Sequence, residues 1–157
     1  MRLDRSSGVL CHVTSLPGPH GIGDLGPAAH DFLDVLDAAD QTHWQVLPLG
    51  PTRAAHGDSP YASPSTFAGN PLLVSLERLV DRGWLDPLDP PVFDADAVEY
   101  DRVRAFKTDA LRRAHEGFEE AASEAERAAF EEFRASADWL DDYALYAALT
   151  DYFDGAP

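Results

Sequence analysis

The sequence predicts an α/β protein in which a β-α-β unit comes first and a mostly helical segment follows. Two short runs of strand length, residues 8–14 and 44–49, flank a segment with helical periodicity. After residue 98, apolar side chains recur every three or four positions, and no further strand pattern interrupts them. The 157 residues, 45% of them hydrophobic, suffice for one core or for a piece of a larger domain.

The β-α-β unit is predicted segment by segment. Residues 8–14 (G-V-L-C-H-V-T) are β-prone, and the stretch 15–26 that follows them is rich in proline and glycine, which favours a loop. A helix is expected from Pro27, because proline suits a first helical turn. Its predicted apolar face consists of Ala29, Phe32, Leu33, Leu36 and Ala39. The run 44–49 (W-Q-V-L-P-L) has the continuous apolar character of a strand buried on both faces, so we expect parallel pairing with the first strand.

The rest of the chain is predicted to be a long loop and then helices. The loop covers residues 50–70, a short apolar segment spans 72–85, and a Pro/Asp-rich linker covers 86–96. One helix face is predicted from Val103, Phe106, Lys107, Ala110, Leu111 and Ala114, and another from Leu140, Tyr143, Ala144 and Ala147. Ser123 and Glu126 have the spacing of a capping box. We therefore divide the chain into residues 1–70 and 71–157.

The charge balance excludes some partners. Twelve basic and twenty-eight acidic side chains give a net charge of −16, which repels nucleic-acid phosphates and anionic membranes. A signal peptide and an apolar run of about 18 residues are both absent from the sequence, so we expect a soluble cytoplasmic protein. Lys107 is the only lysine, and aspartate outnumbers glutamate. This composition suits a halophilic protein, in which salt screens self-repulsion; an acidic protein from a GC-rich genome is the alternative.

No metal site is expected. Cys11 is the only cysteine, so a disulfide within the chain or a thiolate zinc cluster cannot form. The six histidines are scattered without the spacing of metal ligands.

The segment Gly21–Gly26 (G-I-G-D-L-G) matches the G-x-G-x-x-G pattern of dinucleotide-binding folds. Two details oppose that interpretation. Six residues with two prolines separate the first strand from the first glycine, so the tight turn of that fold cannot form. An acidic residue for a ribose hydroxyl is also lacking at the end of the second run. A plain glycine-rich loop is the simpler interpretation.

A barrel of alternating strands and helices explains this order better, because its ligand groups lie on loops after the strands. The second loop carries G-D-S-P-Y-A-S at residues 57–63. Pro60 biases Ser59 toward an extended backbone and fixes the direction in which Tyr61 leaves the chain. An aromatic ring beside Asp58 and a serine suits sugar binding, because the ring covers the C–H face of a pyranose while the oxygens bond its hydroxyls.

Four linked blocks carry a family resemblance: G-V-L-C-H-V-T-S-L-P-G-P-H-G-I-G-D-L-G, W-Q-V-L-P-L-G-P-T, G-D-S-P-Y-A-S and F-A-G-N-P-L-L. In order and spacing the chain resembles the amylomaltase family of 4-α-glucanotransferases, and weaker similarity continues through residues 77–85 and 139–145. The resemblance implies the first two strands of an elaborated (β/α)8 barrel, followed by a mostly helical inserted subdomain.

The resemblance also implies an activity, the transfer of α-1,4-glucan segments to glucose or maltooligosaccharides with retention and without a cofactor. Retaining enzymes of this kind use two carboxylates about 5 to 5.5 Å apart, which in this family lie on later strands. No catalytic residue is assigned in this chain. Asp58, Ser59 and Tyr61 match the loop that holds the donor sugar and are the predicted substrate-binding residues. The chain departs from the family at residues 53–56, where an aromatic is common, and at Ala62, which is often glutamine.

The length suggests a fragment. A (β/α)8 barrel takes roughly 250 residues, and the segment 154–157 looks like an interruption of a family motif. We expect a truncated reading frame or half of a split protein, inactive alone, whose partners are α-1,4-glucans and the missing C-terminal part of the same enzyme. A non-catalytic sugar-binding or regulatory fragment is the alternative.

Overall fold

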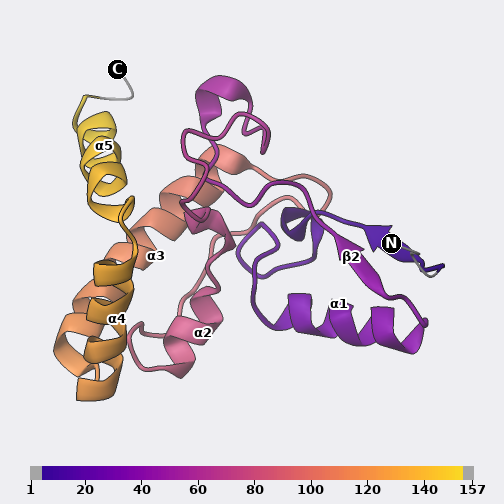
Figure 1. The fold of residues 1–157 in the computed structure, drawn as a ribbon, viewed down its shortest axis with the longest axis horizontal. Coiled ribbons are helices and arrows are strands. Elements are labelled where there is room, and N and C mark those ends of the chain that lie inside the picture. Colours follow the sequence, from indigo (N-terminus) through magenta and orange to yellow (C-terminus); the bar gives the residue numbers. More distant parts are fainter. Residues whose placement is uncertain (1–4, 154–157) are drawn as a thin grey trace.

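A computed structural model describes residues 5–153, and the segment 154–157 discussed above lies outside the described residues. The first part is a β-α-β unit (Figure 1). Strand β1 (Gly8–Leu10) pairs in parallel with β2 (His43–Gln45), with Val9 opposite Trp44, and helix α1 (Pro27–Ala38) connects them. The predicted strand order, parallel pairing and helix start at Pro27 are confirmed.

The two strands are shorter and more exposed than predicted. β2 ends at Gln45, and Leu10 of β1 is 58% exposed. Within the described residues the sheet has only these two strands. Helix α1 lies along the sheet (Figure 1), and Phe32 contacts Trp44 edge to face with ring centres 5.0 Å apart. The prediction of a second strand buried on both faces is wrong for this chain, because no second layer and no further strand cover the sheet within the described residues.

The glycine-rich loop between β1 and α1 is filled by the chain itself. A Cβ atom on Gly23 would collide with the carbonyl oxygens of Val13 and Leu16. Asp24 in the same loop is buried and bonded to a lysine of a later helix. The loop therefore has no open cradle of amides for a pyrophosphate, which removes the dinucleotide interpretation.

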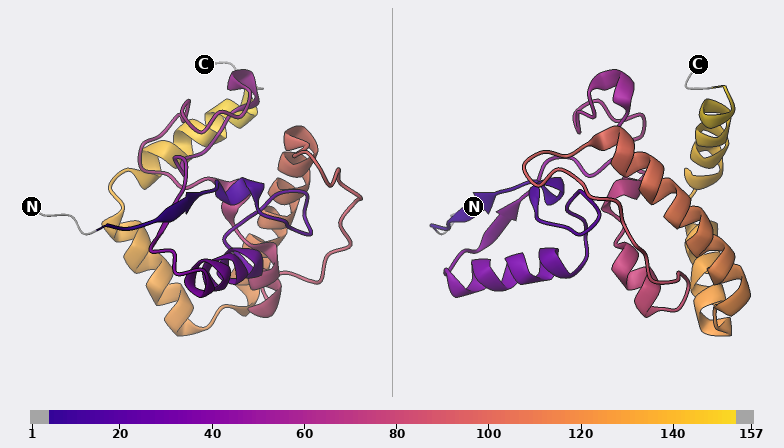
Figure 2. Two further views of the ribbon diagram at one scale, coloured as in Figure 1. Left: turned by 90° about the vertical axis from the view of Figure 1, so that its right-hand side faces the viewer. Right: turned by 180° about the vertical axis from the view of Figure 1, so that it is seen from behind.

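The helical part begins with a 3-10 turn, η3 (Pro71–Leu73), and a short helix, α2 (Leu76–Asp81). A long loop then leads to α3 (Tyr100–Ala121), α4 (Glu124–Ser136) and α5 (Leu140–Tyr152). Figure 2 shows α3 and α4 folded back on each other, with α5 continuing away from α4. The predicted helical character of the last third is confirmed.

The core lies along one face of α3. The buried side chains of α3 belong to Val103, Lys107, Ala110 and Ala114, which are four of the six residues predicted for that face. Leu76 and Leu85 pack against Ala110, whereas Ile22, from the loop after β1, packs with Leu72 against Val103. The two clusters both lie against α3, and the cluster around Val103 joins residues from both predicted regions.

Lys107 lies in this core with no exposed side-chain surface. Its Nζ donates to Asp24 Oδ2 at 2.9 Å and to the carbonyl oxygen of Leu72 at 2.8 Å. Burial lowers the pKa of Lys107, while the charge and hydrogen bond of Asp24 act in the opposite direction. The ion pair ties α3 to the loop after β1.

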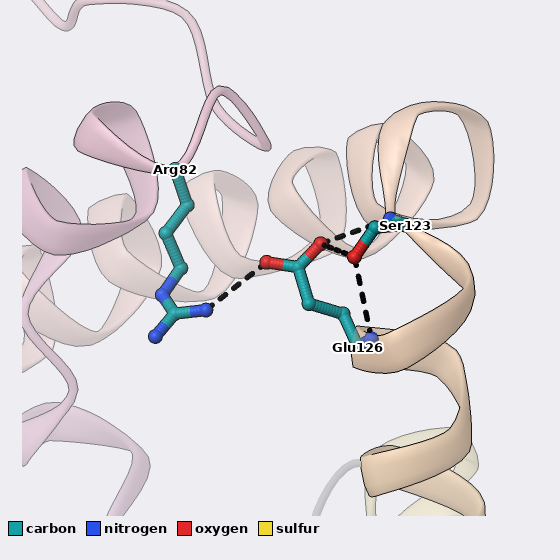
Figure 3. A network of polar contacts seen from close by, with 3 residues as sticks. All are labelled: Arg82, Ser123 and Glu126. Carbon is teal, nitrogen blue, oxygen red and sulfur yellow. Dashed lines mark hydrogen bonds and ion pairs between the residues drawn. The ribbon is translucent and has the colours of Figure 1, made fainter.

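The predicted capping box at the start of α4 is confirmed (Figure 3). Glu126 N donates to Ser123 Oγ at 3.3 Å, and Ser123 N donates to the Glu126 carboxylate at 2.9 Å. Arg82, just after α2, donates to the other carboxylate oxygen at 3.1 Å. The hydrogen bonds to the Glu126 carboxylate lower the pKa of Glu126; the largest contributions come from the amide and then the hydroxyl of Ser123, and Arg82 adds to them. The box therefore caps α4 and also fastens it to α2.

Helix α5 differs from its prediction. Tyr143 is half-buried, but no residue of α5 is fully buried, so the predicted apolar face at Leu140, Tyr143, Ala144 and Ala147 is not a core face here. The reason is that few contacts hold α5 to the rest of the chain, among them an exposed ion pair between Asp151 and Arg112 of α3. Most of the surface of α5, its apolar side chains included, therefore stays exposed to solvent.

Candidate functional site

The loop after β2 contains all three predicted site residues, and a tight turn lies just before them. A 3-10 turn, η2 (Ala54–His56), ends at Gly57, whose φ is 63°, and Asp58 follows with φ 53°. Both residues are left-handed, a conformation that glycine adopts freely and aspartate tolerates better than most residues. The Asp58 amide donates to the carbonyl oxygen of Arg53 at 3.0 Å and so closes the turn.

Asp58 points into the protein. Its side chain is only 5% exposed, and Thr52 Oγ1 donates to Asp58 Oδ1 at 2.9 Å. Arg104 of α3 donates to the same oxygen and forms an ion pair with it. The structure therefore gives Asp58 partners within the chain and buries it, and its predicted contact with substrate stays a prediction.

Ser59 and Tyr61 have different places in the loop. The amide of Tyr61 donates to Ser59 Oγ at 3.3 Å, and the amide of Ala62 donates to the Ser59 carbonyl oxygen at 3.1 Å. Ser59 therefore stabilises the turn around Pro60. The Tyr61 side chain, in contrast, is 74% exposed. Among the three predicted residues, only Tyr61 has a side chain largely free for a ligand.

The second half of the loop presents another exposed aromatic, Phe67. Its amide donates to Ser65 Oγ at 3.2 Å, and the loop ends where Asn70 Oδ1 accepts from Leu72 N at 3.0 Å. Phe67 opens the F-A-G-N-P-L-L block, but no sequence pattern singled it out as a contact residue. The structure indicates Phe67 as a second candidate contact residue, because its aromatic side chain is exposed in a loop that is otherwise hydrogen-bonded.

Two arginines of the site were missed by the sequence reasoning. Arg104 reaches Asp58 across 46 residues of chain, and its Nη1 lies 3.4 Å from the carbonyl oxygen of Thr52. Arg53 lies over the ring of Tyr146 in α5, 5.1 Å from its centre. The sequence feature that could have pointed to Arg104 is its spacing on α3. It precedes Lys107 by three residues and so borders the predicted core face.

Two cavities border the first half of the loop. One of about 580 Å³ lies between the loop, α3 and α5, and its walls include Thr52, Arg104, Tyr143 and Tyr146. The other, of about 470 Å³, is more open and reaches Asp58. Tyr61 lines neither of these two cavities. In the described part of the chain, His, Cys, Asp and Glu form no group of three suited to a metal ion.

Burial also shifts the pKa of a residue in the larger cavity. It raises the pKa of the Tyr143 phenol above its usual range, and the charge of Arg53 opposes this shift. Tyr143 therefore stays a neutral hydrogen-bonding group at neutral pH. The wall of this cavity can therefore donate hydrogen bonds from the Tyr143 hydroxyl and the Arg104 guanidinium, and Tyr143 adds no negative charge to it.

Comparisons with known proteins identify the family. The profile of a family described as 4-alpha-glucanotransferase matches residues 11–157. The chain is 51% identical over 158 residues to the 4-alpha-glucanotransferase of Thermus thermophilus, which covers 100% of the chain and 31% of the relative. It is 47% identical over 156 residues to that of Synechocystis, with 97% of the chain and 30% of the relative covered.

A solved structure agrees with these relatives. An amylomaltase from Streptococcus agalactiae in complex with acarbose superposes with a TM-score of 0.78 at 34% identity, over 98% of the chain and 31% of that protein. The chain thus spans about a third of the length of the relatives that it matches. No helix within residues 5–153 is long and apolar enough to cross a membrane. The chain belongs to the 4-alpha-glucanotransferase family.

Proposed function

We propose that this chain is the N-terminal part of an enzyme that transfers α-1,4-glucan segments to glucose or maltooligosaccharides with retention of configuration. The observation that carries the proposal is the match along the whole chain to 4-alpha-glucanotransferases, at 51% identity to the Thermus thermophilus relative. The structural likeness to an amylomaltase bound to acarbose supports an α-glucan as the ligand.

Within this enzyme, the role of the chain is to hold the donor sugar. The Ser59–Pro60 turn fixes the direction of Tyr61, and its exposed ring is available to stack on a glucose residue. The nucleophile and the acid/base carboxylate that a retaining transfer needs are expected in the remaining two thirds of the enzyme. The 157-residue chain alone is therefore expected to release no glucose from maltotriose. No observation favours the alternative of a non-catalytic sugar-binding fragment.

A hybrid enzyme tests the proposal. Residues 1–157 replace the matching segment of the Thermus thermophilus relative, and maltotriose disproportionation is measured as glucose release. We expect an active hybrid and an inactive isolated chain. A folded hybrid without activity would contradict the proposal, and so would glucose release by the isolated chain.

The same hybrid tests Tyr61. Losing the ring in Tyr61→Ala should lower kcat/KM by roughly five- to 150-fold, which corresponds to about 1 to 3 kcal/mol if a sugar stacks as a nucleobase does. Tyr61→Phe keeps the ring and is the matched control, expected to stay near wild type. Equal losses in both variants would assign the role to the hydroxyl. A large fall in Tm with Tyr61→Ala would show that the residue packs the loop instead.

A further inference from the structure

Arg104 holds two points of the site loop at once. Its guanidinium donates to Asp58 Oδ1, forming the ion pair, and to the carbonyl oxygen of Thr52 at 3.4 Å. Thr52 Oγ1 donates to the same Asp58 oxygen at 2.9 Å. Both ends of the segment 52–58 are thereby joined to each other and to helix α3.

The backbone of this segment needs such an anchor. Gly57 and Asp58 are both left-handed, at φ 63° and 53°. A non-glycine residue in this conformation is strained, so other contacts must stabilise it. The Asp58 carboxylate is 5% exposed and would be an unpaired buried charge without Arg104. Arg104 is 33% exposed and remains solvated on one side, so it loses less by the pairing than a fully buried cation.

Ser59, Pro60 and Tyr61 continue directly from the anchored residue. The bond from the Tyr61 amide to Ser59 Oγ fixes the next turn, so the direction of the Tyr61 ring depends on where Asp58 is held. A planar guanidinium with several donors in a fixed fork suits two acceptors on different residues, which a lysine ammonium satisfies less well.

We propose that Arg104 is a positioning residue for sugar binding, which fixes the loop 52–63 through Asp58 and Thr52 and so sets the direction of Tyr61. This inference rests on the proposed function, because it assigns Arg104 to a loop that contacts the donor sugar. It predicts that loss of Arg104 loosens the loop and weakens sugar binding while α3 and its core remain folded.

The first experiment measures amide hydrogen exchange in the full 157-residue chain. Arg104→Gln should speed exchange at Gly57 and Asp58 by about tenfold or more, since hydrogen bonds to charged groups contribute about 1.5 to 3 kcal/mol. Ala110 in the buried face of α3 should exchange as in wild type. Arg104→Lys keeps the charge and should give an intermediate rate. Arg112→Gln is the matched control, because Arg112 lies on the same helix and pairs with the exposed Asp151.

The second experiment uses the hybrid enzyme. Arg104→Gln should raise KM for maltotriose about fivefold or more with little change in kcat, the pattern of lost ground-state binding, and Arg112→Gln should change neither. Unchanged loop exchange in Arg104→Gln overturns the inference, as does faster exchange with an unchanged KM in an active hybrid. If the unsubstituted hybrid is inactive, the proposed function fails, and the exchange rates still decide whether Arg104 anchors the loop.

Discussion

Helix α3 carries two ion pairs to aspartates of the first 58 residues, and they differ in burial. Lys107 and Asp24 are 0% and 9% exposed, whereas Arg104 is 33% exposed above the buried Asp58. The lysine pair lies inside the core and joins α3 to the loop after β1, and the arginine pair lies at the edge and joins α3 to the site loop. Helix α3 thus holds two loops, one after β1 and one after β2, through side chains that are three residues apart in sequence.

The difference indicates a division of roles. A fully buried pair contributes little net stability compared with an apolar pair of the same shape, but losing one partner is costly because the other charge stays in the core. Losing Arg104 also leaves a buried carboxylate, Asp58, but Arg104 itself is partly exposed, so solvent at this edge can screen part of that charge. We therefore expect the Lys107 pair to control whether the chain folds, and the Arg104 pair to control how one loop is held.

The largest effect is expected for Lys107→Met. The substitution keeps much of the side-chain volume but leaves Asp24 buried without its cation, which should lower the free energy of unfolding by about 3 to 5 kcal/mol. Urea unfolding followed by circular dichroism measures this loss. Arg112→Met on the exposed side of α3 is the control and should change the value by less than about 0.5 kcal/mol.

A second variant sharpens the comparison. Adding Asp24→Asn to Lys107→Met removes the orphaned charge and should recover part of the lost stability. If Lys107→Met unfolds at the same urea concentration as wild type, the buried pair does not control folding, and the contrast between the two pairs fails.

A smaller effect is expected for Gly57→Ala in the site loop. No atom lies within 4 Å of the added Cβ, so the substitution adds no clash, and its cost of about 1 kcal/mol comes from the left-handed φ of 63° alone. Gly69→Ala is the matched control in the same loop, because its Cβ also meets open space and its φ is not positive. Thermal unfolding of the two variants separates backbone strain from side-chain packing; equal Tm values would remove the strain argument.

The smallest effect concerns pH and His20, a buried residue that stacks on Phe106 with ring centres 5.8 Å apart. Burial, and then the charge of Lys107, lower the pKa of His20 below its ordinary value of 6.5, while Asp24 opposes the shift. Because the folded pKa is lowered, the unfolded chain binds the proton more readily, so stability is complete above about pH 6.5 and falls below it.

His20→Phe keeps the stacked ring and removes this titration. The loss of unfolding free energy between pH 7.5 and 5.5 should therefore be smaller in the variant than in wild type. His12, whose pKa burial also lowers, keeps a residual slope in both proteins. Identical slopes in variant and wild type would show that folding does not lower the pKa of His20.

Local patterns predicted the parts of the fold that depend on neighbouring residues. The helix start at Pro27, the capping box at Ser123 and the buried face of α3 each follow from spacing within one or two turns, and all three are confirmed. The exposure of β2 and α5 could not be predicted, because an apolar pattern gives the capacity for burial and not the layer that covers it.

The sequence predicted the loop on which the candidate residues lie, whereas their contact with substrate stays a prediction. The G-D-S-P-Y motif located the loop, and the structure shows Tyr61 exposed on it. The inward turn of Asp58 depends on Arg104, 46 residues later in the chain, and no local periodicity encodes that pairing. Lys107 was predicted on the same helical face as the apolar residues of α3, but Asp24, which pairs with it in the structure, was not identified from the sequence.

The single lysine has a practical consequence for chemical labelling. Lys107 is the only lysine of the sequence and its side chain has no accessible surface, so the folded chain offers amine-reactive reagents no lysine. Acylation of Lys107 therefore requires opening of the core, and the rate of modification by an activated ester reports that opening directly. Mass spectrometry of one site would follow unfolding without an added probe, and lysine-directed coupling to a surface would select molecules whose core is already open.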